Sequence, residues 1–168
     1  MFFERKEIEE KLAPHLHKGE QLYYEIFGHT RDGKEIQSGF SYGCAGGQYK
    51  IILYRVTITT PDGFCVDLDR EQVYRRAEEL GLEKPLLLGF GGGQFDCDRK
   101  VTEKFLEVTC NLAKGKSALD ANTMREGIVV WFKGFDGKWD CLKHKSEEFL
   151  IKESELRDRN VGDVEDNL

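Results

Sequence analysis

Two carboxylates and two lysines stand at positions where they could bind a metal ion and a phosphate compound. Glu25 interrupts an otherwise apolar segment, and Glu126 directly precedes a second one. Lys143 and Lys145 are two residues apart, a spacing that puts both side chains on one face of a strand. Carboxylates can bind sugar hydroxyls and a hydrated divalent metal, while two ammonium groups neutralise a polyphosphate. Together the four residues favour phosphoryl or nucleotidyl transfer, which depends mainly on positioning and charge neutralisation.

Each of these residues alone also fits an ordinary surface position. Acidic residues are mostly exposed, so Glu25 and Glu126 can equally be acids at the ends of strands. Lys143 and Lys145 can likewise protect the edge of a sheet or face the solvent. Only the combination favours the chemical interpretation.

The pattern of apolar and turn residues predicts the elements that must hold these side chains. Apolar residues at helical spacing predict helices, and segments rich in β-branched and aromatic residues predict strands. We expect a helix over 2–18, a strand over 22–28, a turn at 31–33, a strand over 50–60 followed by a hairpin turn at 61–63, a short buried strand and a flexible loop within 86–93, and two strands over 127–133 and 138–145 joined by a turn at 135–137.

Capping residues predict two further helices. Asp69 followed by Gln72 is a capping-box pattern, and Gly81 is a suitable C-terminal cap for the same helix. Asp98 predicts the start of the other helix, whose apolar residues share one face: Val101, Phe105, Val108 and Leu112. Hairpins mixed with helices indicate an α+β fold of antiparallel β-sheets flanked by helices.

Composition points to a soluble globular protein. The 168 residues carry a formal charge of −6, with 39% hydrophobic and 33% charged residues. Six acids and two bases over 153–168 supply −4 of this charge, so we expect one domain over 1–152 and an acidic, flexible tail over 153–168. No apolar run approaches the roughly 20 residues that span a membrane. The start of the chain turns acidic too early for a signal peptide, which predicts a cytoplasmic protein without a membrane partner.

Several familiar active-site patterns are absent from the sequence. The five cysteines form no CxxC pair, which favours free thiols over structural zinc. The histidines form no HExxH pattern and no serine lies in a GxSxG elbow, so zinc and serine hydrolase chemistry has no support. Gly115-Lys116-Ser117 has Cys110 where a P-loop requires its first glycine.

The segments that carry the four residues resemble, in order, the nucleotidyltransferase motifs of ATP-dependent RNA ligases of the phage nick-sealing type. Their superfamily includes DNA ligases and mRNA-capping enzymes. The resemblance covers about residues 20 to 150: YYEIFG (23–28) is similar to motif III, Ile36-Gln37 and Tyr42-Gly43 to the loop that follows it, LYRV (53–56) to motif IIIa, REGIVV (125–130) to motif IV and LKHKSEEFL (142–150) to motif V.

This resemblance implies a role for each matched residue. Glu25 is expected to bind the ribose of ATP or AMP, and Tyr54 to stack on adenine, although Tyr54 fits a core position on a strand equally well. Glu126 is expected to hold Mg²⁺ or Mn²⁺, directly or through water. Lys143 and Lys145 are expected to contact the phosphates. The implied fold is part of an adenylation domain, and the implied partners are RNA ends in a nick or a single strand.

The sequence departs from the family at the nucleophile. Motif I of these ligases is Lys-x-Asp-Gly, whose lysine takes AMP from ATP before AMP moves to a 5′-phosphate and a 3′-hydroxyl displaces it. The three Asp-Gly pairs of this chain are preceded at the lysine position by Thr30, Thr60 and Gly134. We therefore expect that the isolated chain cannot adenylate itself, and that it needs an upstream ligase fragment with Lys-x-Asp-Gly.

Other interpretations of this departure stay open. The chain can be a truncated relic or the product of a misplaced start. It can also be a ligase-like protein that binds a nucleotide or RNA without catalysis. An unrelated α+β interaction domain is the remaining alternative.

Overall fold

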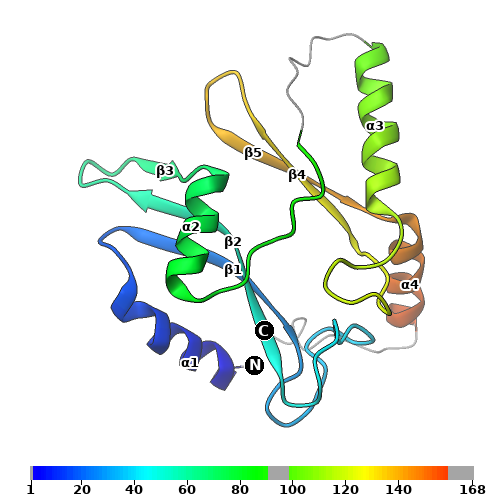
Figure 1. Ribbon diagram of the computed structural model, residues 1–168, viewed down its shortest axis with the longest axis horizontal. Helices are drawn as coiled ribbons and strands as arrows, with labels where there is room; N and C mark the ends of the chain where they lie inside the picture. The colour runs from blue at the N-terminus through cyan, green and yellow to red at the C-terminus, as the bar shows by residue number, and fades with distance from the viewer. Residues whose placement is uncertain (1, 91–98, 159–168) are drawn as a thin grey trace. The chain divides into compact units, whose positions relative to one another are not determined.

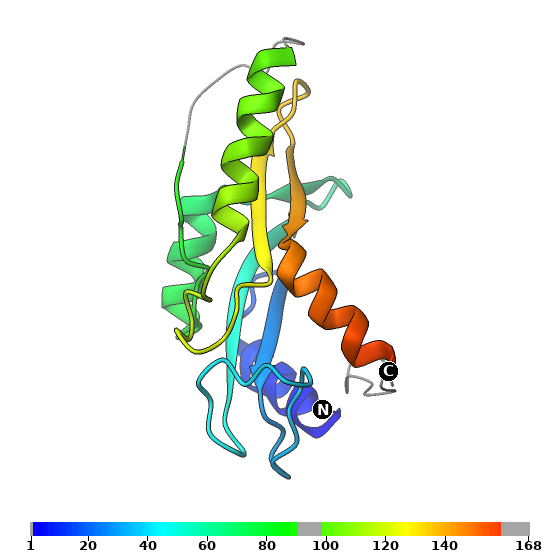
Figure 2. The same cartoon turned by 90° about the vertical axis from the view of Figure 1, so that its right-hand side faces the viewer.

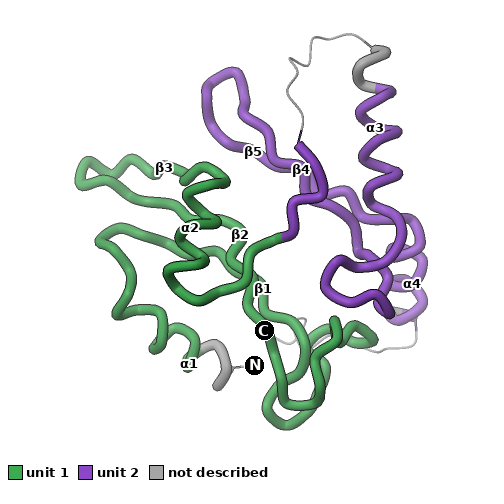
Figure 3. The backbone as a smooth tube through the Cα atoms, in the orientation of Figure 1, with its two compact units in different colours: residues 1–85, 163–168 green, residues 86–162 purple. Residues whose placement is uncertain are grey.

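The computed structural model describes residues 2–90 and 99–158, which form two compact units (Figures 1 and 3). Unit 1 contains the described residues up to Pro85, and unit 2 those from Leu86 onward. The elements are α1 (Phe2–Leu12), the 3-10 turn η1 (Ala13–His15), β1 (Glu20–Gly28), β2 (Tyr49–Thr59), β3 (Cys65–Asp67), α2 (Arg70–Leu80), α3 (Arg99–Ala113), β4 (Gly127–Lys133), β5 (Trp139–Lys145) and α4 (Glu147–Asp158).

Unit 1 is a three-stranded antiparallel sheet, in the order β1-β2-β3, with α2 packed on one face. Its core joins Leu53 and Val56 of β2 to Val73 and Ala77 of α2, and all four are buried. Helix α2 is capped as predicted: Asp69 and Gln72 form a reciprocal capping box, and Gly81 adopts the left-handed conformation at φ 65°. The predicted hairpin turn between β2 and β3 is also confirmed, by the hydrogen bond from the amide of Gly63 to the carbonyl of Thr60.

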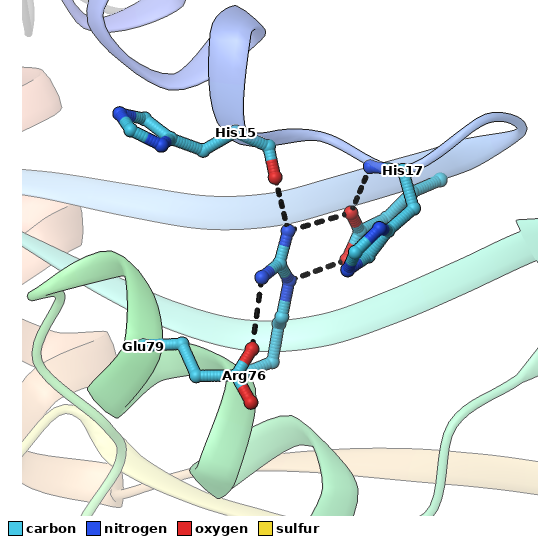
Figure 4. A network of polar contacts seen from close by, with 5 residues as sticks. His15, His17, Arg76 and Glu79 are labelled. Atoms are coloured by element: carbon cyan, nitrogen blue, oxygen red, sulfur yellow. Dashed lines mark hydrogen bonds and ion pairs between the residues drawn. The ribbon is translucent and has the colours of Figure 1, made fainter.

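A buried ion pair fastens α2 to the chain around the start of β1 (Figure 4). Arg76 donates to both carboxylate oxygens of Glu20, at 2.7 and 2.9 Å, and also to the carbonyl of His15 and the carboxylate of Glu79. The amide of His17 donates to Glu20 as well, at 2.8 Å. Burial by itself raises the pKa of Glu20, but the hydrogen bonds from Arg76 and His17 and the charge of Arg76 outweigh it, so this pKa is lowered.

The long loop between β1 and β2 has its own small core. Phe27 at the end of β1 meets Tyr42 edge to face at a centroid distance of 5.3 Å, and Phe40 stacks on Tyr42 at 6.1 Å. Ile36 and Cys44 are also buried in the same loop. The predicted turn at its start is confirmed by the hydrogen bond from the amide of residue 33 to the carbonyl of residue 30.

Unit 2 is the antiparallel hairpin of β4 and β5, with α3 packed against both strands (Figure 2). The two strands and their turn lie where the sequence predicts them. Together the two units confirm an α+β architecture of small antiparallel sheets and helices. None of the helices in residues 2–90 and 99–158 is long and apolar enough to cross a membrane.

The first helix is shorter than predicted. It ends at Leu12 instead of residue 18, and η1 follows before the chain becomes extended at Leu16. Pro14 explains this difference, because it has no amide hydrogen for the next helical hydrogen bond and its ring crowds the preceding turn. A short 3-10 turn tolerates this missing donor.

The predicted buried strand within 86–93 is wrong for its described part. Residues 86–90 form no strand, and Leu86 and Phe90 are 63% and 95% exposed. An apolar run indicates a strand only when a neighbouring strand supplies its hydrogen bonds, and these residues have no strand partner. Residues 91–93 lie outside the described residues.

The predicted face of α3 is also only partly right. Thr109 and Ala113 are buried, whereas Val108 is 47% exposed. Thr109 can be buried because its hydroxyl donates to the carbonyl of Leu106 within the same helix, at 3.0 Å. The predicted cap Asp98 and the side chain of Val101 lie outside the described residues.

Helix α4 was not predicted. It begins after Ser146 and continues to Asp158, so the boundary expected at residue 153 lies inside it (Figure 2). The rest of the expected tail, residues 159–168, lies outside the described residues.

Candidate functional site

The hairpin of unit 2 brings three of the predicted site residues together. Lys145 pairs with Gly127 across the hairpin and Lys143 pairs with Val129, so both lysines lie on one face of the sheet. Glu126 directly precedes β4 at the same end of the hairpin. The spacing of the two lysines and the position of the acid before its strand therefore place all three side chains together.

The two ammonium groups converge on one carboxylate. The Nζ atom of Lys143 lies 2.6 Å from Oε1 of Glu126, and the Nζ atom of Lys145 lies 3.8 Å from the same oxygen. The Glu126 side chain is 20% exposed, against 55% for Lys143 and 30% for Lys145. The cluster is thus reachable from solvent, and its carboxylate is its least exposed member.

Ser146 holds this end of the hairpin in shape. Its amide donates to the carbonyl of Glu126 at 2.7 Å, and its hydroxyl donates to the carbonyl of Arg125 at 2.9 Å. The same hydroxyl accepts from the amide of Phe149 at 3.2 Å, which makes Ser146 the N-cap of α4. One buried serine therefore joins the start of β4, the end of β5 and the first turn of α4.

Gly127 allows the strands to approach closely beside the cluster. A Cβ atom at this position would collide with the carbonyl oxygen of His144. Only glycine can therefore follow Glu126 without pushing β4 and β5 apart at the point where the lysines and the carboxylate meet.

The opposite face of the hairpin is held by α3. His144 alternates with the two lysines along β5, and its Nε2 atom lies 3.7 Å from Sγ of Cys110 in α3. Arg125 donates to the carbonyl of Leu112, in the same last turn of α3 as Cys110, with a distance of 2.5 Å. These contacts leave the lysine face on the side of the hairpin away from α3.

The other two predicted site residues belong to unit 1. The register between β1 and β2 shifts at one point, where Tyr23 pairs with Arg55 and Tyr24 pairs with Leu53. Tyr54 is the extra residue at this β-bulge. A β-bulge redirects side chains, and bulges often lie next to functional sites. This bulge changes the sheet face on which Tyr54 lies.

The bulge puts Tyr54 on the same sheet face as Glu25. Leu53 and Val56 are three residues apart, yet both are fully buried against α2. Strict alternation would put one of them on the other face, and the extra residue between them removes that conflict. Tyr54, 37% exposed, and Glu25, also exposed, therefore share the face away from α2.

A second set of polar contacts covers part of this face. Arg55 forms a bidentate ion pair with Asp67 on β3, at 2.5 and 3.0 Å, and its guanidinium lies 4.8 Å from the centre of the Tyr23 ring. The hydrogen bond to Asp67 raises the pKa of Arg55. Arg70 donates to the carbonyl of Tyr54 at 2.8 Å, which fixes the backbone of the bulge to the start of α2.

The loop residues that resemble the ligase loop are joined to each other. The hydroxyl of Tyr42 donates to the side-chain oxygen of Gln37 at 3.0 Å. Tyr42 has a positive φ of 50°, which is uncommon for a residue other than glycine. This hydrogen bond and the aromatic contacts of Tyr42 hold the unusual backbone in place.

Sequence reasoning missed one member of the cluster. The Oε1 atom of Glu153, on α4, lies 2.7 Å from Nζ of Lys145. The expected boundary at residue 153 separated this acid from the site. Ser146 followed by two glutamates was a usable signal for a helix start, because serine is a preferred N-cap and acids favour the first turn.

The oxygen and nitrogen groups of the cluster suit a metal-bound phosphate better than a metal held by protein alone. Among the residues that the structure describes, no group of three or more His, Cys, Asp or Glu side chains could hold a metal ion. Mg²⁺ commonly binds through one or two carboxylates, with water and substrate phosphates as its other ligands. Glu126 can supply such a carboxylate, provided that the metal competes with the ammonium of Lys143.

The structure thus joins Glu126, Lys143 and Lys145 in one cluster of unit 2, and puts Glu25 and Tyr54 on one sheet face of unit 1. A scan of protein families and searches of curated proteins and solved structures found no match for this chain.

Proposed function

We propose that the chain is a module of an ATP-dependent RNA ligase, a cytoplasmic enzyme that joins 3′-hydroxyl and 5′-phosphate RNA ends through adenylated intermediates. The observation that carries the proposal is the convergence of Lys143 and Lys145 on Glu126 at one end of the β4–β5 hairpin. Two cations beside a carboxylate suit a polyphosphate and its divalent metal. The order of the ligase-like segments along the chain supports the choice of reaction.

The proposal gives each cluster residue a distinct task. Lys143 and Lys145 bind the phosphates of ATP, and one of them neutralises the charge that grows as pyrophosphate leaves the α-phosphate. Glu126 binds Mg²⁺ or Mn²⁺, directly or through water. The metal ion, when bound, supplies positive charge to the phosphate oxygens.

In unit 1, the proposed tasks concern the nucleoside. Glu25 accepts a hydrogen bond from the ribose, and Tyr54 stacks on adenine. Both lie on the sheet face away from α2, and a tyrosine residue that is 37% exposed can still offer surface for a base.

The nucleophile must come from elsewhere in this proposal, because the 168 residues contain no Lys-x-Asp-Gly. An upstream ligase fragment would supply that lysine. The test is to mix the chain with a fragment that carries Lys-x-Asp-Gly and to measure the sealing of nicked RNA with ATP and Mg²⁺. The isolated chain should take no covalent label from radioactive ATP, and the mixture should both take the label and seal the nick.

Variants of the cluster make this test specific. Lys143→Ala in the mixture should reduce sealing by roughly 100-fold, since removal of one preorganised charge-stabilising group has an effect of that order. Lys138→Ala, at an exposed lysine in the turn between β4 and β5, is the matched control and should leave sealing unchanged. Sealing by Lys143→Ala at the rate of the unchanged chain would contradict the proposal.

A second candidate function rests on the same absence of Lys-x-Asp-Gly. A chain that keeps the phosphate cluster without the nucleophile can bind a nucleotide or an RNA end without catalysis. Binding of Mg·ATP or of 5′-phosphorylated RNA that needs Lys143, with no sealing in any mixture, would favour this alternative.

A further inference from the structure

Glu153 contacts the proposed phosphate cluster from outside the hairpin. Its carboxylate lies 2.7 Å from Nζ of Lys145, a distance typical of a charge-assisted hydrogen bond. Glu126, the other carboxylate near this ammonium, is 3.8 Å away and beyond hydrogen-bond range. Glu153 is thus the stronger carboxylate partner of Lys145.

The contact is built into the fold of unit 2. Phe149 is 1% exposed and lies one helical turn before Glu153, so the two side chains share one face of α4. The ammonium of Lys145 lies 5.1 Å from the centre of the Phe149 ring. Ser146 directly follows Lys145 and caps α4, which fixes the start of the helix. The carboxylate of Glu153 is therefore held close to the ammonium of Lys145.

The two lysines of the cluster are therefore unlike each other. Lys143 is 55% exposed, whereas Lys145 is 30% exposed and is covered by α4. A phosphate oxygen that approaches Lys145 meets a carboxylate already bound to it.

The net charge of the cluster also disfavours the binding of an anion. Two ammonium groups and two carboxylates make the cluster neutral, whereas the three residues predicted from sequence would carry a net positive charge. An anion is attracted less strongly to a neutral cluster than to a positive one at the same distance. Glu153 is the residue that makes this difference.

We propose that Glu153 sets the anion affinity of this site, because its carboxylate holds Lys145 and competes with phosphate for that ammonium. The inference rests on the proposed function of the cluster as a phosphate site. It adds a competing residue, on a helix outside the ligase-like strands, to the residues that bind.

The test measures the binding of inorganic tripolyphosphate and, separately, of Mg·ATP by calorimetry at low ionic strength. Glu153→Gln keeps the shape of the side chain and removes its charge. It should tighten tripolyphosphate binding by roughly two- to five-fold, the range expected for a partly exposed ion pair. Damage to the fold cannot produce such a gain.

Glu155→Gln is the matched control. It makes the same charge change on an exposed residue of the same helix, so it reports the effect of net charge alone. Glu153→Gln should tighten tripolyphosphate binding clearly more than Glu155→Gln does. Equal effects of the two variants on tripolyphosphate binding, or weaker binding by Glu153→Gln than by the unchanged chain, would overturn the inference. So would the absence of tripolyphosphate binding by both the unchanged chain and Glu153→Gln.

A second readout follows Lys145 itself without any ligand. Correlation spectra of lysine ammonium groups, assigned with Lys145→Arg, should show faster hydrogen exchange at Lys145 in Glu153→Gln than in the unchanged chain. Unchanged exchange at Lys145 would contradict the proposed contact.

The two ligands separate this inference from the proposed function. If ATP binds no more tightly than tripolyphosphate to the unchanged chain, the nucleotide function fails while the competition by Glu153 stands. If ATP binds specifically and Glu153→Gln behaves as Glu155→Gln does, only the inference about Glu153 fails.

Discussion

Two clusters of carboxylates and cations in this protein differ in what they can do. In unit 1, Arg76 uses four hydrogen bonds, two of them to a Glu20 side chain that is only 1% exposed. In unit 2, Lys143 and Lys145 meet Glu126 through side chains that stay 55% and 30% exposed. The Arg76–Glu20 ion pair of the first cluster is buried, with side chains 11% and 1% exposed, whereas the second cluster is open to solvent.

The difference separates a structural ion pair from the proposed binding site. A planar guanidinium that uses four of its five donors in a fixed geometry joins segments of the chain and has little left for a ligand. Ammonium groups on flexible stems keep donors that a ligand can use. The open cluster is therefore the one to which we assign a phosphate.

Removal of Arg76 should have the largest effect on stability. Arg76→Ala leaves the buried carboxylate of Glu20 without its charged partner, and loss of one member of a buried pair destabilises proteins by about 3 kcal/mol or more. Urea unfolding followed by circular dichroism measures this loss.

Arg75→Ala is the control for this prediction. It removes the same type of charge from the neighbouring, exposed position of α2, and it should change stability by less than about 0.5 kcal/mol. Similar losses for the two variants would show that the Glu20 pair does not hold α2 in place.

Acidic pH should also weaken the Arg76–Glu20 ion pair, with a smaller loss of stability than Arg76→Ala causes. The pKa of Glu20 is lower in the folded chain than its ordinary value of 4.5, so its contribution is complete above that pH and is lost as the pH falls through the folded pKa. Stability curves of the unchanged chain and of Glu20→Gln should therefore differ most near neutral pH and converge in acid. A difference in stability between the two proteins that stays constant from pH 7 to pH 3 would contradict the lowered pKa of Glu20.

The open cluster should matter least for stability. A variant with both Lys143→Ala and Lys145→Ala loses only partly exposed ion pairs, each of which contributes up to about 1 kcal/mol. Its unfolding midpoint in urea should lie close to that of the unchanged chain. A collapse of stability comparable with that of Arg76→Ala would instead make this cluster structural.

Local signals predicted much of the fold. The cap of α2 depends on Asp69, Gln72 and Gly81, which act within one or two turns of the chain, and the structure reproduces all three. The turns of both hairpins are equally local. Two lysines separated by one residue on a strand needed only the alternation of side chains to share a face.

Features that depend on distant residues were not predictable in this way. Glu20 and Arg76 are 56 residues apart, and nothing in either segment indicates the other. The bulge at Tyr54 is visible only once Leu53 and Val56 are known to face the same helix. Glu153 was missed because its acidic surroundings resemble a tail, whereas α4 is anchored by Phe149 packing.

Equilibrium binding of Mg·ATP tests the central claim most directly. The double variant at Lys143 and Lys145 keeps the buried Arg76–Glu20 ion pair of unit 1, so it should fold normally. It should bind Mg·ATP at least about ten-fold more weakly than the unchanged chain, as expected for lost charge-assisted hydrogen bonds. Equal affinity of the two proteins for Mg·ATP would contradict the assignment of the phosphate to this cluster.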